Sequence, residues 1–416
     1  MTAESKASPQ RKASPQRTAV PESNAAPDST ASLVRDASPY AGPDDRRFTL
    51  WRAADRILSG PRPVTLHERL AELGADARAC VGPAERPDFY GDGVVADLEQ
   101  QVAELLGKPA AAFFPTGTMA QQVALRCWAR QCGTSVVASH PLAHIETHER
   151  RAYRRLTGLD TVFPTTAPRL PTAAELRAVD EPYGVLLAEL PLRAAGFVLP
   201  DWAELVELTA AARAADAVVH LDGARLWEAA AHYGRPPHQL ADLGDSVYVS
   251  FYKALGGISG AALAGPAELI AEARVWRHRY GGQLYQQWPA ALSARAALGR
   301  ELPRLPGYLA QAGVLADGLR RAIRPVPGAR IHPDPPHTHQ FQLWLPHPPE
   351  LLTEAGLRHC ARSGDGLFGS WWAGPLPGLS MTELTALTPA LAWTADQVAE
   401  SVAGFLDEVD RLAAAG

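Results

Sequence analysis

Lysine is rare in this chain, and one lysine stands where an amine could act as a nucleophile. The 416 residues hold 40 lysines and arginines together, but the only lysines are Lys6, Lys12, Lys108 and Lys253. Lys253 follows the apolar run Val247–Phe251 and precedes a glycine-rich turn. Desolvation lowers the pKa of a lysine and favours a nucleophilic amine, a role that arginine cannot take. The plain alternative is a lysine whose stem packs while its ammonium reaches water.

A carboxylate ends another apolar run earlier in the chain. Asp222 follows Ala217–Leu221 and is itself followed by Gly-Ala-Arg225. A carboxylate at the carboxyl end of a buried parallel strand faces the crevice where α/β sheets bind ligands, although it could also cap a helix. A Schiff-base lysine with an aspartate for a pyridinium nitrogen is the protein side of pyridoxal phosphate chemistry.

A third segment could bind the phosphate of such a cofactor. Thr116, Gly117 and Thr118 lie between the apolar run Ala110–Phe114 and a helix expected from about Met119. Backbone N–H groups at a helix start, together with two hydroxyls, form an anion site. A simple capped turn would have the same sequence, so this signal gains weight only beside the lysine and the aspartate.

A histidine follows the next expected strand. His144 could stack on a planar ring or move a proton. A metal site is the alternative, because His140, His144 and His148 recur at intervals of four residues. Pro141 argues against one continuous helix through all three, so no metal site is predicted.

The elements that must position these residues alternate between helix and strand. The expected helices are Val94–Leu106, Met119–Arg130, Thr147–Leu156, Trp202–Ala214 and Ala395–Ala413. The expected strands are Ala110–Phe114, Val136–Val137, Val185–Leu190, Ala217–Leu221, Val247–Phe251 and Phe341–Leu345. Most of these strands are continuous apolar runs, which indicates a parallel sheet covered on both faces, an α/β fold. Phe341–Leu345 alternates instead, which predicts an antiparallel strand with one solvated face.

Composition divides the chain into three parts. Residues 1–45 are rich in Ser, Ala and Pro and contain a direct repeat, which predicts a disordered tail. Residues 46–304 are expected to form a large cofactor-binding domain. Prolines interrupt the pattern after about residue 300, so residues 305–416 are expected to form a small C-terminal α+β domain.

The overall charge and the apolar runs exclude several classes of protein. A formal net charge of −5 argues against a general nucleic-acid binder. No apolar run reaches the roughly 18 residues that a membrane span needs, and the N-terminus lacks a secretory apolar segment. The four cysteines have neither zinc-ribbon nor disulfide spacing. A cytoplasmic protein without a membrane partner is therefore expected.

Together, these segments resemble the threonine aldolase branch of the fold-type I pyridoxal phosphate enzymes, which is often grouped with the β-eliminating lyases. The resemblance covers about residues 85–300. Its matching stretches are Phe89–Asp92, Phe114–Val123, Ala143–Ile145, His220–Arg225, Asp245–Val249, the Lys253 segment and Arg279–Gly282. It implies a large domain with a mostly parallel seven-stranded sheet and a small C-terminal α+β domain.

The resemblance also implies pyridoxal 5'-phosphate as the cofactor and a role for each residue that would hold it. Lys253 would form the Schiff base, and Asp222 would pair with the pyridine nitrogen. His144 would stack on the ring and take part in proton transfer. The phosphate would be held by Thr116, Gly117 and Thr118.

Two more residues are implied on the substrate side. Arg225 would contact the phenolic oxygen of the cofactor or the substrate carboxylate, for which a bidentate guanidinium is suited. Tyr90 would line the site, in its own or a neighbouring subunit, because this family builds its sites at subunit interfaces. A homodimer or homotetramer is therefore expected.

The chain departs from the family pattern at several positions. The family's early serine is missing from Pro61–Thr65, Tyr252 stands before the lysine in place of serine, and Tyr285 stands where the family has arginine. The small domain of the family supplies an arginine to the substrate carboxylate, but residues 383–398 contain none. Either Arg225 does this work alone, or the substrate differs from threonine.

The expected activity is that of a lyase that cleaves or forms the Cα–Cβ bond of a β-hydroxy-α-amino acid, giving glycine and an aldehyde. β-Elimination, racemisation, transaldol exchange and transamination stay open, because the outcome depends on which Cα bond is held perpendicular to the ring. A non-catalytic interaction protein that has lost the cofactor is the remaining alternative.

Overall fold

The computed structural model describes residues 45–374 and 377–415. The predicted disordered tail lies outside the described residues, apart from Asp45 at the start of α1. The helices are α1 (Asp45–Ala53), α2 (Leu66–Cys80), α3 (Val94–Leu106), α4 (Gly117–Cys132), α5 (His144–Thr147), α6 (Ala152–Thr157), α7 (Ala173–Arg177), α8 (Trp202–Ala214), α9 (Leu226–Tyr233), α10 (Pro237–Ala241), α11 (Ala267–Arg279), α12 (Trp288–Glu301), α13 (Leu305–Ile323), α14 (Pro349–Ser363) and α15 (Ala395–Ala415). Two 3₁₀ turns, η1 (Leu302–Arg304) and η2 (Thr388–Ala392), accompany them.

The strands form three sheets within the described residues. They are β1 (Arg56–Ile57), β2 (Ala110–Phe114), β3 (Val136–Ala138), β4 (Asp160–Val162), β5 (Val185–Glu189), β6 (Val218–Gly223), β7 (Ser246–Ser250), β8 (Ala261–Gly265), β9 (Arg330–His332), β10 (Gln340–Leu345), β11 (Asp365–Gly366), β12 (Trp372–Ala373) and β13 (Ser380–Thr385).

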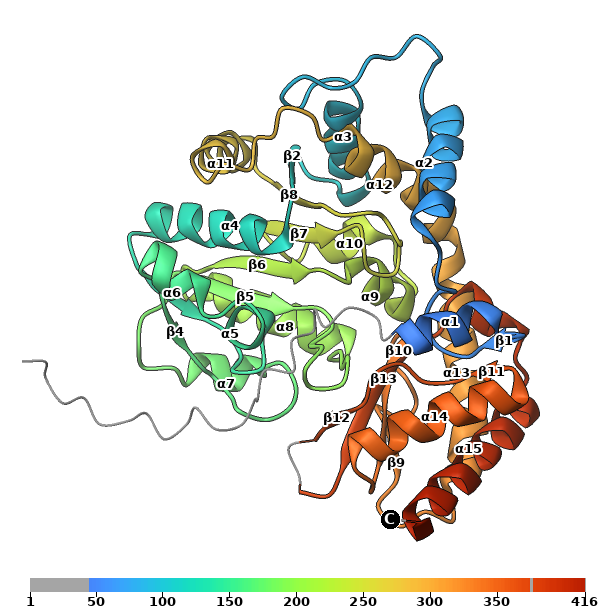
Figure 1. Ribbon diagram of the computed structural model, residues 1–416. Coiled ribbons are helices and arrows are strands. Elements are labelled where there is room, and N and C mark those ends of the chain that lie inside the picture. The colour runs from blue at the N-terminus through green and yellow to red at the C-terminus, as the bar shows by residue number, and fades with distance from the viewer. Residues whose placement is uncertain (1–44, 375–376, 416) are drawn as a thin grey trace, which may run out of the picture. The chain divides into compact units, whose positions relative to one another are not determined.

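The large sheet has seven strands in the order β2-β8-β7-β6-β5-β3-β4 (Figure 1). The pairs from β4 through β7 are parallel, whereas β8 runs antiparallel to both β7 and β2. The prediction of a mostly parallel seven-stranded sheet is therefore confirmed. Because β5, β6 and β7 point the same way, their carboxyl ends meet at one edge of the sheet.

Alternate residues of the strands enter two different cores, one on each face of this sheet. In β5, Leu186 and Ala188 pack with α3, α8, α9 and α12, while Val185 and Leu187 pack with α4, α6 and α11. Helix α3 is the clearest local case, since its apolar stripe is buried and Gly107 ends it with the positive φ of 61° that glycine tolerates. Two covered faces explain the continuous apolar strands of the sequence.

The C-terminal part has an antiparallel sheet of its own, in the order β12-β13-β10-β9. Helices α13, α14 and α15 pack on it around a separate core that includes Phe341, Leu343 and Phe405. This is the predicted α+β arrangement. Helix α13 is shared, because Tyr308 packs in the core of the large sheet and Leu315 in the C-terminal core.

The first described residues also pack with the C-terminal part. Helix α1 lies beside α14 in Figure 1, and β1 pairs with β11 in parallel. Trp51 and Ile57 share a small core with Leu357. No helix among the described residues combines the length and apolarity that crossing a bilayer requires.

Two expectations about local structure were wrong. The helix predicted over Thr147–Leu156 is two short helices, α5 and α6, because Arg150 and Arg151 adopt positive φ values of 52° and 55°. Strand β10 is antiparallel as predicted but has no solvated face. Phe341, Leu343 and Leu345 pack in the C-terminal core on one face, and Gln342 on the other face is buried near Gly196 of the turn after β5.

Candidate functional site

Three side chains stand in one row at the carboxyl edge of the large sheet. Asp222 of β6 is the register partner of Glu189 in β5 and of Tyr248 in β7. Residues opposite each other on adjacent strands project from the same face. All three are buried, and the Oδ1 atom of Asp222 accepts a hydrogen bond of 3.1 Å from the N–H of Ala224. The predicted aspartate therefore lies in a row with two groups that the sequence did not single out.

The two carboxyls of this row are difficult to ionise together. Burial raises the pKa of Glu189 to about 7, and the adjacent Asp222 raises it further. Burial also raises the pKa of Asp222, whereas His144 and Lys253 oppose that rise. A cationic group placed against Asp222 would relieve this cost, because an opposite charge nearby favours the ionised carboxyl.

Lys253 follows β7 in a tight loop. The Phe251 N–H bonds to Gly260 O, and the Gly257 N–H bonds to Phe251 O, so the loop closes on itself. Burial lowers the pKa of the Lys253 ammonium to about 8, and Arg225 lowers it further. Asp222 and Glu189 act in the opposite sense, which places both carboxyls within electrostatic reach of the amine. The predicted lysine and aspartate thus belong to one cluster.

His144 begins α5 and joins the same cluster. Its backbone N–H donates to Glu189 Oε2 at 2.7 Å, and its Nδ1 atom lies 2.9 Å from Glu149 Oε1. Gln122 donates to the other oxygen of Glu149 at 2.9 Å. Burial lowers the pKa of His144 to about 4 and raises that of Glu149 to about 7. Within the described residues the Nε2 atom of His144 has no hydrogen-bond partner, so it is available to a ligand.

The other two histidines of the motif do not form a metal site with His144. The Nε2 atom of His140 bonds to Ala167 O at 2.7 Å, and its Nδ1 atom accepts the Leu142 N–H at 3.0 Å. The ring of His148 lies 5.2 Å from that of His144, centroid to centroid.

The predicted phosphate segment is the first turn of α4. Thr116 is its N-cap, and its hydroxyl accepts the Met119 N–H at 3.2 Å. The N–H groups of Gly117 and Thr118 lie in the first turn, where no intrahelical acceptor exists. A Cβ atom at Gly117 would collide with the hydroxyl of Tyr248, so this position accepts only glycine without rearrangement. The helix start therefore lies directly beside the row of Asp222.

Arg225 lies just after β6 and is buried. Its Nε atom donates to Gln340 Oε1 in β10 at 2.6 Å, and its guanidinium lies 5.1 Å from the centre of the Phe197 ring. Among the described residues, its two terminal nitrogens have no hydrogen-bond partner and no carboxylate within ion-pair distance. These two terminal nitrogens are thus available to a ligand.

Tyr90 lies in an exposed group of aromatic side chains. It is 46% exposed and has a φ of 53°. Its ring packs edge-on against Phe89 and Tyr285, at centroid distances of 5.0 and 5.6 Å. The expected place of Tyr90 in the site of its own or a neighbouring subunit stays a prediction.

The sequence patterns did not reveal several charged groups of the cluster. The pattern that identified Asp222 could also have identified Glu189, because both are acidic residues at the end of an apolar strand. Glu228 lies on the buried face of α9, where both of its oxygens lack a partner among the described residues. Burial raises its pKa to about 7. Only the strand register and the helix packing bring these residues to one place.

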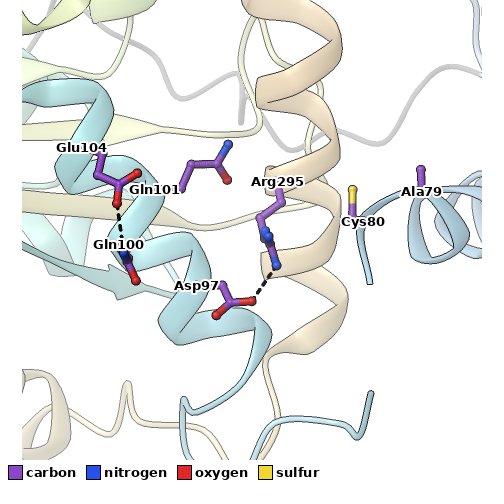
Figure 2. A pocket seen from close by; sticks show the side chains of 7 residues that line it. All are labelled: Ala79, Cys80, Asp97, Gln100, Gln101, Glu104 and Arg295. Atoms are coloured by element: carbon purple, nitrogen blue, oxygen red, sulfur yellow. Dashed lines mark hydrogen bonds and ion pairs between the residues drawn. The ribbon is translucent and has the colours of Figure 1, made fainter. Parts of the chain in front are cut away.

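A separate hollow of about 490 Å³ lies between α2, α3 and α12 (Figure 2). Figure 2 shows Arg295 turned toward Asp97 and Gln100 turned toward Glu104. Each pair is joined by a hydrogen bond of 2.9 Å. None of its seven lining residues belongs to the Lys253 cluster. It brings together no lysine, histidine or other group suited to this chemistry, which points to the cluster instead.

The cluster fits pyridoxal phosphate. It offers a half-buried amine at Lys253 and a buried carboxyl at Asp222 for the two ends of a pyridine aldehyde. The start of α4 offers N–H groups to a phosphate, and the close approach of Tyr248 to Gly117 forms one wall beside them.

Comparisons with known proteins give the same assignment. The chain matches the β-eliminating lyase family over residues 75–340. It is 34% identical to Aldolase vrtJ of Penicillium aethiopicum over 221 residues, which are 51% of this chain and 56% of that protein. It is 31% identical to the low specificity L-threonine aldolase of Saccharomyces cerevisiae, over 54% of this chain and 58% of that protein. The matches thus span little more than half of these relatives.

Solved structures match over more of the chain. A crystal structure from Exiguobacterium, assigned as an aromatic amino acid β-eliminating lyase/threonine aldolase, has a TM-score of 0.79 at 33% identity, over 87% of this chain and 99% of that one. A Listeria monocytogenes protein assigned as an L-allo-threonine aldolase also has a TM-score of 0.79, at 31% identity, over 88% of this chain and 99% of that one. With its seven-stranded sheet and its Lys253 cluster, the chain belongs to the β-eliminating lyase family, in the threonine aldolase branch of the fold-type I pyridoxal phosphate enzymes.

Proposed function

We propose that this protein is a pyridoxal phosphate-dependent lyase that cleaves a β-hydroxy-α-amino acid to glycine and an aldehyde, or joins them in reverse. The observation that carries the proposal is the grouping of Lys253, buried Asp222 and half-buried His144 at the carboxyl edge of the sheet. The family assignment and the aldolase names of its relatives support the same reaction.

The roles of the cofactor-holding residues follow from their surroundings. When bound, pyridoxal phosphate supplies an electron sink for the bond that breaks at Cα. Lys253, whose pKa burial lowers to about 8, would hold the cofactor through its amine, because a lowered pKa favours the nucleophilic form. Asp222 holds a proton on the pyridine nitrogen, because the buried carboxylate is stabilised by that cation.

His144 is the candidate base for the β-hydroxyl of the substrate. Its Nδ1 atom is engaged by Glu149, which orients the ring and stabilises the positive charge that forms when Nε2 takes a proton. Its lowered pKa keeps the ring neutral at pH 7 and ready to accept. Arg225 binds the substrate carboxylate through its two free terminal nitrogens.

The active form is proposed to be a homodimer or homotetramer. Phe89, Tyr90 and Tyr285 form an exposed cluster of aromatic side chains on one subunit. A second copy that covers this cluster would remove apolar surface from water and bring Tyr90 toward a neighbouring site. Light scattering during size-exclusion chromatography should give at least two chains per particle, and a monomer at working concentration would contradict this part.

The activity is tested with the cofactor-loaded protein and β-hydroxy-α-amino acids such as threonine, allo-threonine and phenylserine. Glycine and the matching aldehyde should appear in equal amounts, and Lys253→Ala should abolish both. Lys108→Ala is the matched control, since its Nζ atom bonds to Gly244 O at 2.8 Å, away from the cluster. Release of ammonia and a keto acid without glycine would favour elimination and contradict the proposal.

A further inference from the structure

A second arginine stands beside Arg225 on a turn that the sequence did not mark. Residues 192–198 form a tight turn closed by a bridge between Leu192 and Val198. The N–H groups of Gly196 and Phe197 bond to Arg193 O. The backbone N–H of Arg193 itself donates to Glu189 Oε1 at 3.1 Å. Arg193 is therefore fixed to the carboxyl that also holds His144.

The guanidinium of Arg193 reaches toward the C-terminal sheet. Its Nη2 and Nε atoms lie 2.9 and 3.3 Å from the same oxygen of Glu383 in β13, and its Nη1 atom lies 3.3 Å from His148 Nε2. Its side chain is 27% exposed and that of Glu383 is 16% exposed. Because both groups contact Oε2 alone, the pair is not a two-pronged fork, and part of the guanidinium remains accessible.

Arg193 acts electrostatically on the whole cluster. Its charge is among the causes that lower the pKa of Lys253, of His144 and of Arg225. The same turn carries Phe197, whose ring lies against the guanidinium of Arg225. One turn therefore carries Arg193 and the aromatic ring that packs against Arg225.

Only one of these two arginines has an ion-pair partner within the described residues. Glu383 is the ion-pair partner of Arg193, but Arg225 is buried and has none. Glu228 lies near Arg225, but burial raises its pKa to about 7, so it is only partly ionised at neutral pH. A buried cation without a full counter-charge is unstable. An anionic ligand group between the two guanidinium groups would complete the site.

The charge arrangement also accounts for a departure in the sequence. Residues 383–398 contain no arginine to meet a substrate carboxylate, and β13 instead presents Glu383 to the cluster. The positive charge comes from the opposite side of the site, on the turn after β5.

We propose that Arg193 and Arg225 together bind the α-carboxylate of the amino acid substrate, with Glu383 as the positioning residue of Arg193. This inference rests on the proposed function, because it requires an amino acid bound beside Lys253. Arg193 contacts the substrate directly, and Glu383 acts only by holding the guanidinium in place.

The test measures ligand binding to the cofactor-loaded protein, without turnover. Glycine and methylamine differ by one carboxylate, and their dissociation constants follow from the change in cofactor absorbance during titration. Arg193→Gln should weaken glycine binding at least tenfold and change methylamine binding by less than about twofold. Arg193→Lys keeps the positive charge but not the planar guanidinium, so it should weaken glycine binding to an intermediate degree.

Two further variants separate a direct role from a structural one. Glu383→Gln should weaken glycine binding less than Arg193→Gln does and leave methylamine binding unchanged, because the guanidinium remains present. Arg130→Gln removes an exposed arginine of α4 from an ion pair with Glu272 of α11 and should change neither constant. Thermal unfolding of each variant checks that it is folded.

The outcomes separate the carboxylate assignment from the proposed function. An Arg193→Gln variant that binds glycine as tightly as the unaltered protein overturns the carboxylate assignment alone. Equal weakening of glycine and methylamine binding overturns it as well. A cofactor-loaded, unaltered protein that binds no glycine overturns the proposed function, and this inference with it.

Discussion

Glu228 should make the folded protein less stable as the pH rises, and replacing it should remove that loss. Its carboxyl is fully buried on α9, and both oxygens lack a partner among the described residues. Burial raises its pKa from the usual 4.5 to about 7, partly offset by Arg225 and Lys253. The unfolded chain thus loses this proton at a lower pH than the folded protein does.

The sign and size of the effect follow from this difference. Below pH 4.5 the carboxyl is protonated in both the folded and the unfolded chain, so its ionisation does not change the free energy of unfolding. Between pH 4.5 and about 7 only the unfolded chain ionises, so the free energy of unfolding falls, and above pH 7 the loss is constant. Each pKa unit between 4.5 and about 7 corresponds to about 1.4 kcal/mol. The free energy of unfolding therefore falls by about 3 kcal/mol over this range.

Glu228→Gln should therefore gain stability relative to the unaltered protein as the pH is raised. The comparison is the difference in melting temperature between variant and unaltered protein, measured at pH 4.5 and again at pH 8. That difference should be roughly 3 to 6 °C more favourable to the variant at pH 8. The new amide can also change stability in ways that do not depend on pH. Such changes are the same at pH 4.5 and pH 8 and cancel in this comparison.

A matched control uses the exposed Glu207 on α8. Glu207→Gln should shift the melting temperature equally at both pH values, because its carboxyl is solvated in both states. If Glu228→Gln behaves like this control, Glu228 is not held as a buried acid and the reasoning fails.

Two other changes test the cofactor site. Gly117→Ala should lower the affinity for pyridoxal phosphate at least tenfold in a titration of cofactor absorbance, because its Cβ collides with the Tyr248 hydroxyl. Gly299→Ala, in α12 with nothing within 4 Å of the added atom, should leave that affinity unchanged, and equal losses in both would refute the steric argument. Glu149→Gln should lower kcat for aldol cleavage about tenfold or more with little change in KM, because the ring of His144 loses the charge that stabilises its protonated form. An unchanged kcat would remove His144 and Glu149 from the proton transfer.

Helix and strand positions followed closely from the sequence where the signal was local. The apolar stripe of residues 94–106 and the glycine after it define α3 completely, and both come from neighbouring residues. The helix expected over residues 147–156 failed because helical periodicity does not reveal the positive φ of Arg150 and Arg151. The solvated face expected for β10 failed because burial there depends on helices and a turn that are distant in sequence.

The candidate site divides in the same way. Lys253 and Asp222 were visible because each ends an apolar run, and the structure brings both into one cluster. Arg193 and Glu383 could not be found from local pattern, since they are paired only when β13 of the second sheet meets the turn after β5. Neither residue ends a strand or sits in a glycine-rich segment, so the sequence gives no sign of the contact.

The most direct test of the proposed reaction centre is to find where the cofactor is attached. The protein is incubated with pyridoxal phosphate, reduced with borohydride, digested and examined by peptide mass spectrometry. We predict that the added mass lies on the peptide containing Lys253 and that Lys253→Ala abolishes it. A label on Lys108 instead, or no label on a protein that holds the cofactor, would contradict the assignment of this cluster as the reaction centre.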